Sequence, residues 1–335
     1  MKKITTILFF VFSLATQAQD IHFSQFYNAP LNLNPANTGA FDGNYRFGAN
    51  YREQWKSVTV PYKTFSAWAD FSLISRHHRR SFPSFGLVID RDKAGDGNLS
   101  TTKVMGSFAY HTALDRHRYH MLAVGVQFGA IQKSIDWQFL YFNNQWNDQK
   151  FDNAIPNNEP YTKEKISYTD IELGANFSSE VDKTFNWYAG LSTYHLIKPQ
   201  ESFYSNINHL GVRPVFNGGA NFKASRNIYV HPSFEYMNQK NASEMLVGSL
   251  ASYNLEYVGN GYDKVFAGIF YRVKDAIIPV VGYQMNNWKL TMNYDVNVSQ
   301  LKPFSHGRGA IEISIIYIGA MSKQTHTLTM PCPRF

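Results

Sequence analysis

The chain has 335 residues, with 32 Lys and Arg against 25 Asp and Glu, which gives a formal net charge of +7 at pH 7. No long run of Lys or Arg concentrates this charge, so the sequence does not indicate nucleic acid as a partner. The only cysteine, Cys332, excludes an internal disulfide framework and a cysteine-based zinc site. After residue 18, no segment approaches about 18 consecutive apolar residues, so membrane-spanning helices are not expected.

Residues 1–18 have the three parts of a secretory signal peptide. Two lysines follow the first methionine, residues 4–15 are almost wholly apolar, and small residues precede a cleavage site that we place after Ala18. A buried N-terminal helix is the alternative. Cleavage would remove the two lysines and lower the formal charge from +7 to +5. The exported chain is then expected to be either soluble in an envelope compartment or a β-barrel.

Residues 19–43 form an aromatic, Asn-rich segment ahead of the first expected strand. Asn34 and Pro35 suit a helix N-cap followed by the first helical position. Because the apolar side chains here need burial, we expect this segment to fold as a plug or hatch inside a barrel, with a short periplasmic tail as the alternative. The expected plug residues are Phe23, Gln25, Phe26, Tyr27, Asn34 and Pro35.

Alternating polar and apolar residues recur from residue 44 to residue 320. In 287–299 every even position is apolar, starting with Trp288, and every odd position is polar. A strand sends successive side chains to opposite faces, so such a run has one apolar and one polar face. Fourteen segments are expected strands: about 44–53, 64–75, 84–91, 99–113, 118–132, 168–179, 185–197, 211–223, 228–238, 243–258, 264–273, 277–285, 287–299 and 309–319.

These strands predict an all-β fold, an integral antiparallel barrel of the outer membrane that spans residues 44–320. Segments of ten to fifteen residues and an aromatic content of 16% suit strands that cross a lipid bilayer. The alternative is a soluble β-sandwich, whose strands are shorter and bury their apolar faces against each other. Backbone polar groups in lipid must be paired, which requires the sheet to close.

Connection lengths give a second test, because outer loops of such barrels are long and periplasmic turns are short. With an even number of strands the odd-numbered connections face outward, and 133–167 and 198–210 are long there. The basic connection at 75–83 is the exception among the periplasmic turns. We expect the aromatic residues of the long loops either to bind a partner or to pack across the barrel mouth; they are Trp137, Phe139, Tyr141, Phe142, Trp146, Phe203 and Tyr204.

No motif points to an enzyme, a cofactor or a metal. The chain lacks His-Glu-x-x-His and a Gly-x-Ser-x-Gly elbow. Residues 90–98 resemble a calcium loop, but Arg91 and Lys93 interrupt it, and a tight hairpin turn with Gly and Asn at positive φ is favoured. His77 and His78 lie in the basic turn, where contact with lipid headgroups is favoured over a metal.

Several motifs together resemble the PorP/SprF family of type IX secretion. They are Gln25, the run Leu-Asn-Leu-Asn-Pro-Ala-Asn-Thr-Gly at 31–39, Tyr-Arg-Glu-Gln-Trp at 51–55, His-Gly-Arg-Gly-Ala-Ile-Glu-Ile-Ser at 306–314, and Cys-Pro-Arg-Phe at 332–335. The resemblance implies an outer-membrane protein of Bacteroidota. It also implies a role in secretion, in gliding for some members, or in the export and surface retention of large adhesins with a particular type of C-terminal domain.

The resulting hypothesis is a non-enzymatic barrel in the cell outer membrane that receives a secreted adhesin, most simply by binding its C-terminal domain. Outer-membrane lipid and other type IX secretion or gliding components are its further expected partners. A C-terminal periplasmic tail, 321–335, is expected to contact that machinery through Cys332, Pro333, Arg334 and Phe335. The alternative is a channel for hydrophobic small molecules, because fourteen strands and an Asn-Pro-Ala hatch also resemble the long-chain fatty-acid transporters.

Overall fold

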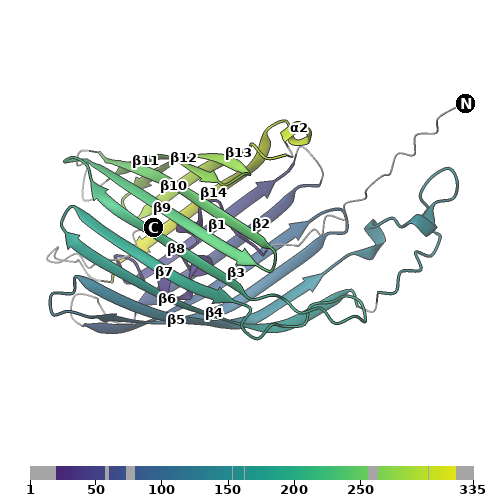
Figure 1. The fold of residues 1–335 in the computed structure, drawn as a ribbon, viewed down its shortest axis with the longest axis horizontal. Coiled ribbons are helices and arrows are strands. Elements are labelled where there is room, and N and C mark those ends of the chain that lie inside the picture. The colour runs from purple at the N-terminus through teal and green to yellow at the C-terminus, as the bar shows by residue number, and fades with distance from the viewer. Residues whose placement is uncertain are drawn as a thin grey trace, which may run out of the picture.

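The computed structural model describes residues 20–56, 60–72, 80–152, 154–161, 163–255, 263–300 and 302–321. The expected signal peptide, the His77-His78 pair and the Cys-Pro-Arg-Phe motif lie outside these residues. The described residues form one closed barrel of fourteen antiparallel strands (Figure 1). Each strand pairs with its neighbours in sequence, and the first pairs with the last, so the predicted fold class is confirmed.

The strand bounds are as follows: β1 (Tyr45–Gln54), β2 (Tyr62–Ser72), β3 (Ser81–Ala94), β4 (Leu99–Ala113), β5 (His120–Ser134), β6 (Lys165–Asp182), β7 (Phe185–Tyr194), β8 (Arg213–Lys223), β9 (Ile228–Gln239), β10 (Ala242–Asn254), β11 (Lys264–Arg272), β12 (Ala276–Met285), β13 (Trp288–Asn297) and β14 (Arg308–Gly319). Short helical turns complete the described structure: η1 (Phe26–Asn28), α1 (Pro30–Leu33), η2 (Pro35–Asn37), η3 (Trp137–Phe139), η4 (Asn143–Gln145) and α2 (Lys302–Ser305). Within the described ranges, none of the helices combines the length and the apolar character needed to cross a membrane.

The fourteen predicted strands are all present, but several of their ends were misplaced. The third runs over Ser81–Ala94 rather than 84–91, and the sixth over Lys165–Asp182 rather than 168–179. Strand pairing continues beyond the band that shows clean alternation, because the ladder depends on backbone hydrogen bonds and not on lipid contact. The seventh strand stops at Tyr194 instead of 197, since His195 adopts a left-handed conformation with φ 59°.

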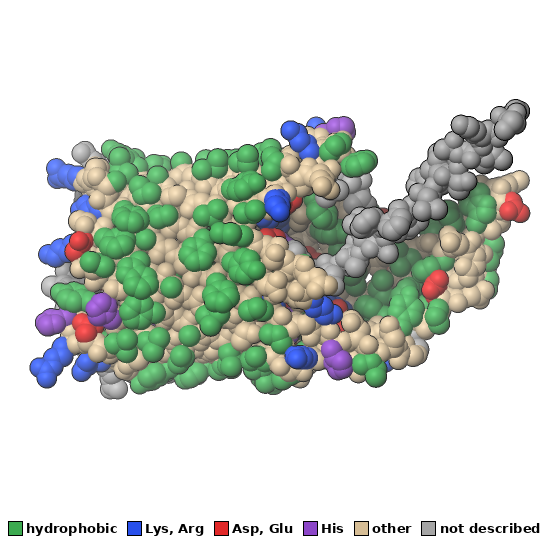
Figure 2. Space-filling view, in the orientation of Figure 1, with side chains coloured by type: hydrophobic (Ala, Val, Ile, Leu, Met, Phe, Trp, Pro, Cys, Tyr) green, Lys and Arg blue, Asp and Glu red, His purple; other side chains and the backbone are tan. Residues whose placement is uncertain are grey.

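The two faces of the wall follow the alternation seen in the sequence. On β13 the residues Trp288, Leu290 and Met292 are exposed, whereas Thr291 and Asn293 point inward and are buried. Hydrophobic side chains cover the outside of the wall, and Lys and Arg side chains gather at its ends (Figure 2). This distribution matches a wall that faces lipid, with a polar interior.

The two ends of the barrel differ in the length of their connections. The long connections β5–β6, β7–β8 and β13–β14 lie at one end, here called the loop end, and the β5–β6 segment projects well beyond the wall (Figure 1). The two-residue connections β6–β7 and β12–β13 lie at the opposite end, here called the turn end. The 90–98 segment is part of the β3–β4 hairpin, where Gly95 and Asn98 have positive φ, so the preferred reading as a tight turn is confirmed.

Candidate functional site

The segment that precedes β1 runs along the inside of the barrel from the loop end to the turn end. At the loop end, Asp20 contacts His195, which directly follows β7, and Arg213, the first residue of β8. At the turn end, the backbone N–H of Asn44 donates to the carbonyl of Gly319, the last residue of β14, at 2.8 Å. The interior wall therefore surrounds this segment over its whole described length.

A buried carboxylate on β14 holds the first part of the segment. Glu312 has no exposed surface, and it accepts hydrogen bonds from the backbone N–H groups of Ser24 and Gln25, each at 2.9 Å. Arg52 on β1 donates to the same carboxylate at 3.1 Å. Bonds from charged groups are the strong class of hydrogen bond, so these contacts fix the segment to the strands where the barrel closes.

A second buried carboxylate extends this cluster toward β13. Asp295 accepts hydrogen bonds from the Ser24 hydroxyl at 2.8 Å and from Arg52 at 3.0 Å. Arg272 on β11 adds a further bond to Asp295 at 3.2 Å. Two arginines and two carboxylates thus meet around the Ser24 hydroxyl. Their ion pairs and hydrogen bonds offset the free-energy cost of burying these charges inside the wall.

The Asn-Pro-Ala turn forms the local structure predicted for it. The side chain of Asn34 accepts a hydrogen bond from the backbone N–H of Ala36 at 2.9 Å, as an N-cap does, and Pro35 occupies the first position of η2. The amide nitrogen of Asn34 also donates to the carbonyls of Ala175 on β6 at 3.0 Å and Leu191 on β7 at 3.3 Å. One side chain therefore both caps the turn and attaches it to the wall.

Glycines on adjacent strands allow this turn to approach the wall closely. A Cβ atom added to Gly174 on β6 would lie 2.0 Å from the Asn34 side-chain oxygen, and one added to Gly125 on β5 would lie 2.4 Å from the Pro35 carbonyl carbon. These two glycines face each other in the β5–β6 register. They form a shallow socket, here called the glycine socket, that any larger side chain would fill.

The apolar residues of the segment find separate partners on the wall. Phe26 and Tyr27 pack against Phe270 on β11, with ring centroids 6.0 and 5.2 Å apart. Leu31 is fully buried in a cluster that includes Met105 of β4. All six residues that we expected to form the plug are buried: Phe23, Gln25, Phe26, Tyr27, Asn34 and Pro35.

A compact aromatic group lies at the loop end and joins two long loops. The Trp137 ring stacks on Tyr161 with centroids 4.3 Å apart and planes 8° apart, and Phe142 also stacks on Trp137, with centroids 6.3 Å apart. Phe203 and Tyr204 from the β7–β8 connection meet Trp137 edge-on at 6.3 and 5.9 Å. These five residues are here called the aromatic platform, and Trp137 at its centre is only 7% exposed.

The remaining aromatic residues expected at this end stay accessible. Phe139, Tyr141 and Trp146 are 57%, 56% and 48% exposed. Phe151 contacts both Tyr141 and Trp146, with centroids 5.6 and 5.2 Å apart. Phe151 and Tyr161 were not predicted as partners from the sequence, although both lie in the same aromatic-rich loop, whose composition was the available signal.

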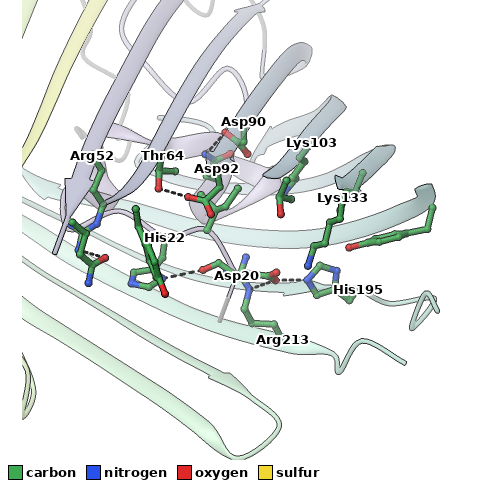
Figure 3. Close-up of a pocket in the computed structure, with 17 residues that line it drawn as sticks. Asp20, His22, Arg52, Thr64, Asp90, Asp92, Lys103, Lys133, His195 and Arg213 are labelled. Carbon is green, nitrogen blue, oxygen red and sulfur yellow. Dashed lines mark hydrogen bonds and ion pairs between the residues drawn. The ribbon is translucent and has the colours of Figure 1, made fainter. Parts of the chain in front are cut away.

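A polar cavity of about 140 Å³ lies at the loop end, between the start of the N-terminal segment and the wall (Figure 3). Its lining residues lie between positions 20 and 213 of the chain, and most are charged or carry a hydroxyl group. The lining residues are Asp20, Ile21, His22, Asn32, Arg52, Gln54, Tyr62, Thr64, Asp90, Asp92, Thr101, Lys103, Ile131, Lys133, Tyr168, His195 and Arg213. This site was not predicted from the sequence, where its signal was charged residues at inward positions of the alternating strands.

Asp20 and His195 form the charged centre of this cavity. Burial alone favours the neutral carboxyl of Asp20, but Arg213 and His195 outweigh it and hold its pKa well below the usual range. Burial also lowers the pKa of His195, yet the charge of Asp20 and hydrogen bonds to Asp170 and Asp20 overcome this and raise it to about 9. The Nδ1 atom of His195 lies 2.5 Å from the Asp170 carboxylate. His195 is therefore protonated at neutral pH.

We expect this ion pair to make barrel stability depend on pH. Because folding raises the pKa of His195 from 6.5 to about 9, its contribution is complete below about pH 6.5 and is lost as the pH rises through 9. The expected loss is on the order of 1–3 kcal/mol. Thermal unfolding midpoints measured at rising pH should fall in this window. His195→Gln should flatten the dependence, whereas His117→Gln, at an exposed turn, should leave it unchanged.

Within the described ranges, no group of three or more His, Cys, Asp or Glu side chains is placed to hold a metal ion.

The barrel, its lipid-facing wall and its polar interior define an integral protein of the outer membrane. Comparison with family models then gives the particular family. The chain matches the type IX secretion system membrane protein PorP/SprF over residues 15–317, and it belongs to that family. It is thus a type IX secretion barrel of the outer membrane.

The chain is also similar in fold to solved outer-membrane barrels. The toluene transporter TbuX of Ralstonia pickettii shares 10% identity with a TM-score of 0.50, over 87% of this chain and 92% of that one. A FadL homologue of Pseudomonas aeruginosa shares 9% identity with a TM-score of 0.48, over 85% and 92%. The search of curated proteins found no significant match. At 10% identity the TbuX structure bears on the fold alone.

Proposed function

We propose that this barrel supports the export and cell-surface retention of a large secreted adhesin by binding the adhesin's C-terminal domain at the loop end. The family gives the secretion route, and the observation that supports the binding role is the aromatic platform. Its five residues already pack against one another around Trp137, while Phe139, Tyr141 and Trp146 remain accessible beside them. Aromatic side chains in this arrangement are the usual anchors of protein interfaces.

The shape of the loop end supports the same role. The β5–β6 segment projects beyond the wall, and hydrophobic side chains line the hollow between this projection and the mouth (Figures 1 and 2). An exposed apolar surface outside the lipid band needs a partner to be covered. A folded domain that docks there would contact the loop end while the barrel anchors it in the membrane.

Replacing the three accessible aromatics tests this proposal. The variant Phe139→Ser, Tyr141→Ser, Trp146→Ser removes anchors worth roughly 2 kcal/mol each at a hot spot, so surface adhesin should fall by more than about tenfold. Trp137 stays in place, so the platform keeps its central stack. The measurement is flow cytometry of surface adhesin in cells whose barrel level is checked by immunoblot.

Phe304 provides the matched control for that experiment. It lies on α2, in the β13–β14 connection, and is 70% exposed. Phe304→Ser removes a comparable aromatic from the same end and should leave surface adhesin unchanged. Wild-type amounts of surface adhesin in the triple variant, at equal barrel levels, would exclude the loop-end role. Affinity purification from native membranes should recover the adhesin with the wild-type barrel and lose it with the triple variant.

We also propose that residues 19–43 plug the lumen. Support comes from the contacts of the segment with β14 through Glu312, with β6 and β7 through Asn34, and with β11 through Phe26. A protein held at the loop end would then be retained without an open pore beneath it. The tail at 321–335 lies almost wholly outside the described residues, and its contact with periplasmic components stays a prediction. Secretion that continues after truncation at Met321 would contradict it.

The alternative role, as a channel for hydrophobic small molecules, has less support. Of the residues that line the loop-end cavity, only Ile21 and Ile131 are aliphatic, and charged side chains dominate the rest. Hydrophobic ligands prefer pockets lined mostly by apolar and aromatic side chains, with few polar groups. A long-chain fatty acid would have to desolvate several charges here, so the chemistry of this cavity favours polar ligands.

A further inference from the structure

Arg213 is a buried cation of the loop-end cavity with unused hydrogen-bonding capacity. The residue is 6% exposed, and its guanidinium carbon lies 4.2 Å from the centroid of the Tyr194 ring, which fixes its orientation. Its Nε atom lies 3.5 Å from the Asp20 carboxylate, which already pairs with His195. Among the described residues the guanidinium donates no hydrogen bond, and its buried Nε has only the longer ion-pair contact with Asp20. The planar guanidinium of Arg213, with its N–H donors unused, suits the two oxygens of a carboxylate.

On the opposite part of the lining, two carboxylates lack a basic partner among the described residues. Asp90 and Asp92 occupy alternate positions of β3, so both face inward. Asp90 accepts a hydrogen bond from Asn32 at 3.0 Å, and Asp92 accepts one from Thr64 at 2.6 Å. Neither forms an ion pair with a basic side chain of the described residues. The side-chain oxygen of Asn32 is also buried without a donor.

The other charges of the lining are already neutralised by partners. Lys103 donates to Glu172, and Lys133 donates to Glu201, each at 2.6 Å. Their presence therefore does not satisfy Asp90 or Asp92. What remains is Arg213, whose ion pair is the 3.5 Å contact with Asp20, and two carboxylates without an ion pair, in a cavity of about 140 Å³. That volume corresponds to roughly five water molecules, which suits a molecule of a few non-hydrogen atoms.

We infer that this cavity binds a small zwitterion, with its carboxylate on Arg213 and its ammonium group toward Asp90 and Asp92. The ligand class is an α-amino acid or the equivalent ends of a short peptide. Such a molecule supplies an acceptor to the unused guanidinium and donors to the unpaired carboxylates, so both charge types become satisfied at once. Gln54, Tyr62 and Arg213 sit at strand ends, so the cavity lies next to the mouth at the loop end. This inference is independent of adhesin binding.

Calorimetric titration of the purified barrel in detergent micelles tests the inference with matched probes. L-Alanine carries both charges, N-acetyl-L-alanine lacks the ammonium, and L-alaninamide lacks the carboxylate. We expect L-alanine to bind at least about tenfold more tightly than either blocked form, since one lost charged bond costs about 1.5–3 kcal/mol. L-Alanyl-L-alanine, in which the charges stand farther apart, distinguishes the two sources of the ligand. Tighter binding of the dipeptide assigns the site to peptides, and weaker binding assigns it to free amino acids.

Variants separate the two halves of the site. Arg213→Gln should weaken L-alanine at least about tenfold while leaving the weak binding of L-alaninamide unchanged. Asp92→Asn should weaken L-alanine and spare N-acetyl-L-alanine. Arg308→Gln, an exposed arginine at the start of β14, is the control and should bind as the wild type does. Equal affinity for L-alanine and its blocked forms, or no measurable heat from L-alanine with the wild type, would overturn the inference. If Arg213→Gln fails to fold, the probe comparison and Asp92→Asn still decide it.

Discussion

Replacing Gly174 with leucine is expected to push the Asn-Pro-Ala turn away from the wall and to open the lumen. A Cβ at this position would already lie 2.0 Å from the Asn34 side-chain oxygen, far inside contact distance, and a leucine adds three further carbons. Overpacking of this kind typically costs about 1–3 kcal/mol. Because β6 is part of a closed sheet, the turn is expected to give way before the strand does.

Conductance across a planar lipid bilayer measures this effect directly. Gly174→Leu should raise ion conductance well above that of the wild type and should lower the thermal midpoint of unfolding. Gly106→Leu on β4 is the matched control, because a Cβ there meets nothing closer than a carbonyl oxygen at 3.8 Å. Gly106 is exposed on the outer face of the barrel, so the control side chain would enter lipid. Equal conductance of the Gly174 variant, the control and the wild type would contradict the plug proposal.

Replacing Glu312 with alanine is expected to cause the largest loss of stability. The change removes the acceptor of the Ser24 and Gln25 backbone N–H groups and leaves the buried guanidinium of Arg52 short of one partner. Breaking a buried ion pair by removing one member costs about 3–5 kcal/mol. Glu312→Gln retains an oxygen acceptor but loses the charge, so its effect should be smaller.

Denaturant titration of the barrel in detergent or lipid, followed by its heat-dependent mobility on gels, would give these values. The order of stability expected is wild type, then Glu312→Gln, then Glu312→Ala. Glu164→Ala is the control, since Glu164 is exposed in the β5–β6 loop and is seen only to accept a hydrogen bond through its backbone carbonyl. If Glu312→Ala were as stable as this control, the buried cluster would not hold the segment in the manner described.

Local features of this fold were predictable from the sequence because they depend on residues close together in the chain. Alternation places Trp288 outside and Asp295 inside on one strand, and the structure agrees. Asn34 and Pro35 form the cap and first turn expected of them. The Trp137-centred aromatic loop was also apparent from composition. The first two depend on interactions that span only a few residues, whereas Phe203 and Tyr204 reach Trp137 from the other long loop.

The loop-end cavity could not be predicted, because its residues meet only after the barrel closes. Asp20, His195 and Arg213 are far apart in sequence, and their contact depends on the register between strands and on the path of the N-terminal segment. Alternation gives the face of each strand but not its vertical alignment with its neighbours. The early end of β7 at His195, which turns this ring toward Asp20, is likewise set by a tertiary contact that overrides strand propensity.

The position of Ser24 and Gln25 bears on how the barrel can be assembled. Arg52 of β1 and Glu312 of β14 are direct partners in the ladder that closes the sheet, although 260 residues separate them. Bringing such distant ends together carries a large loop-closure entropy. Ser24 and Gln25 bind Glu312 and lie only 28 and 27 residues from Arg52. We expect these contacts to hold the last strand beside the first during assembly, which would make closure of the ring and insertion of the N-terminal segment one cooperative step.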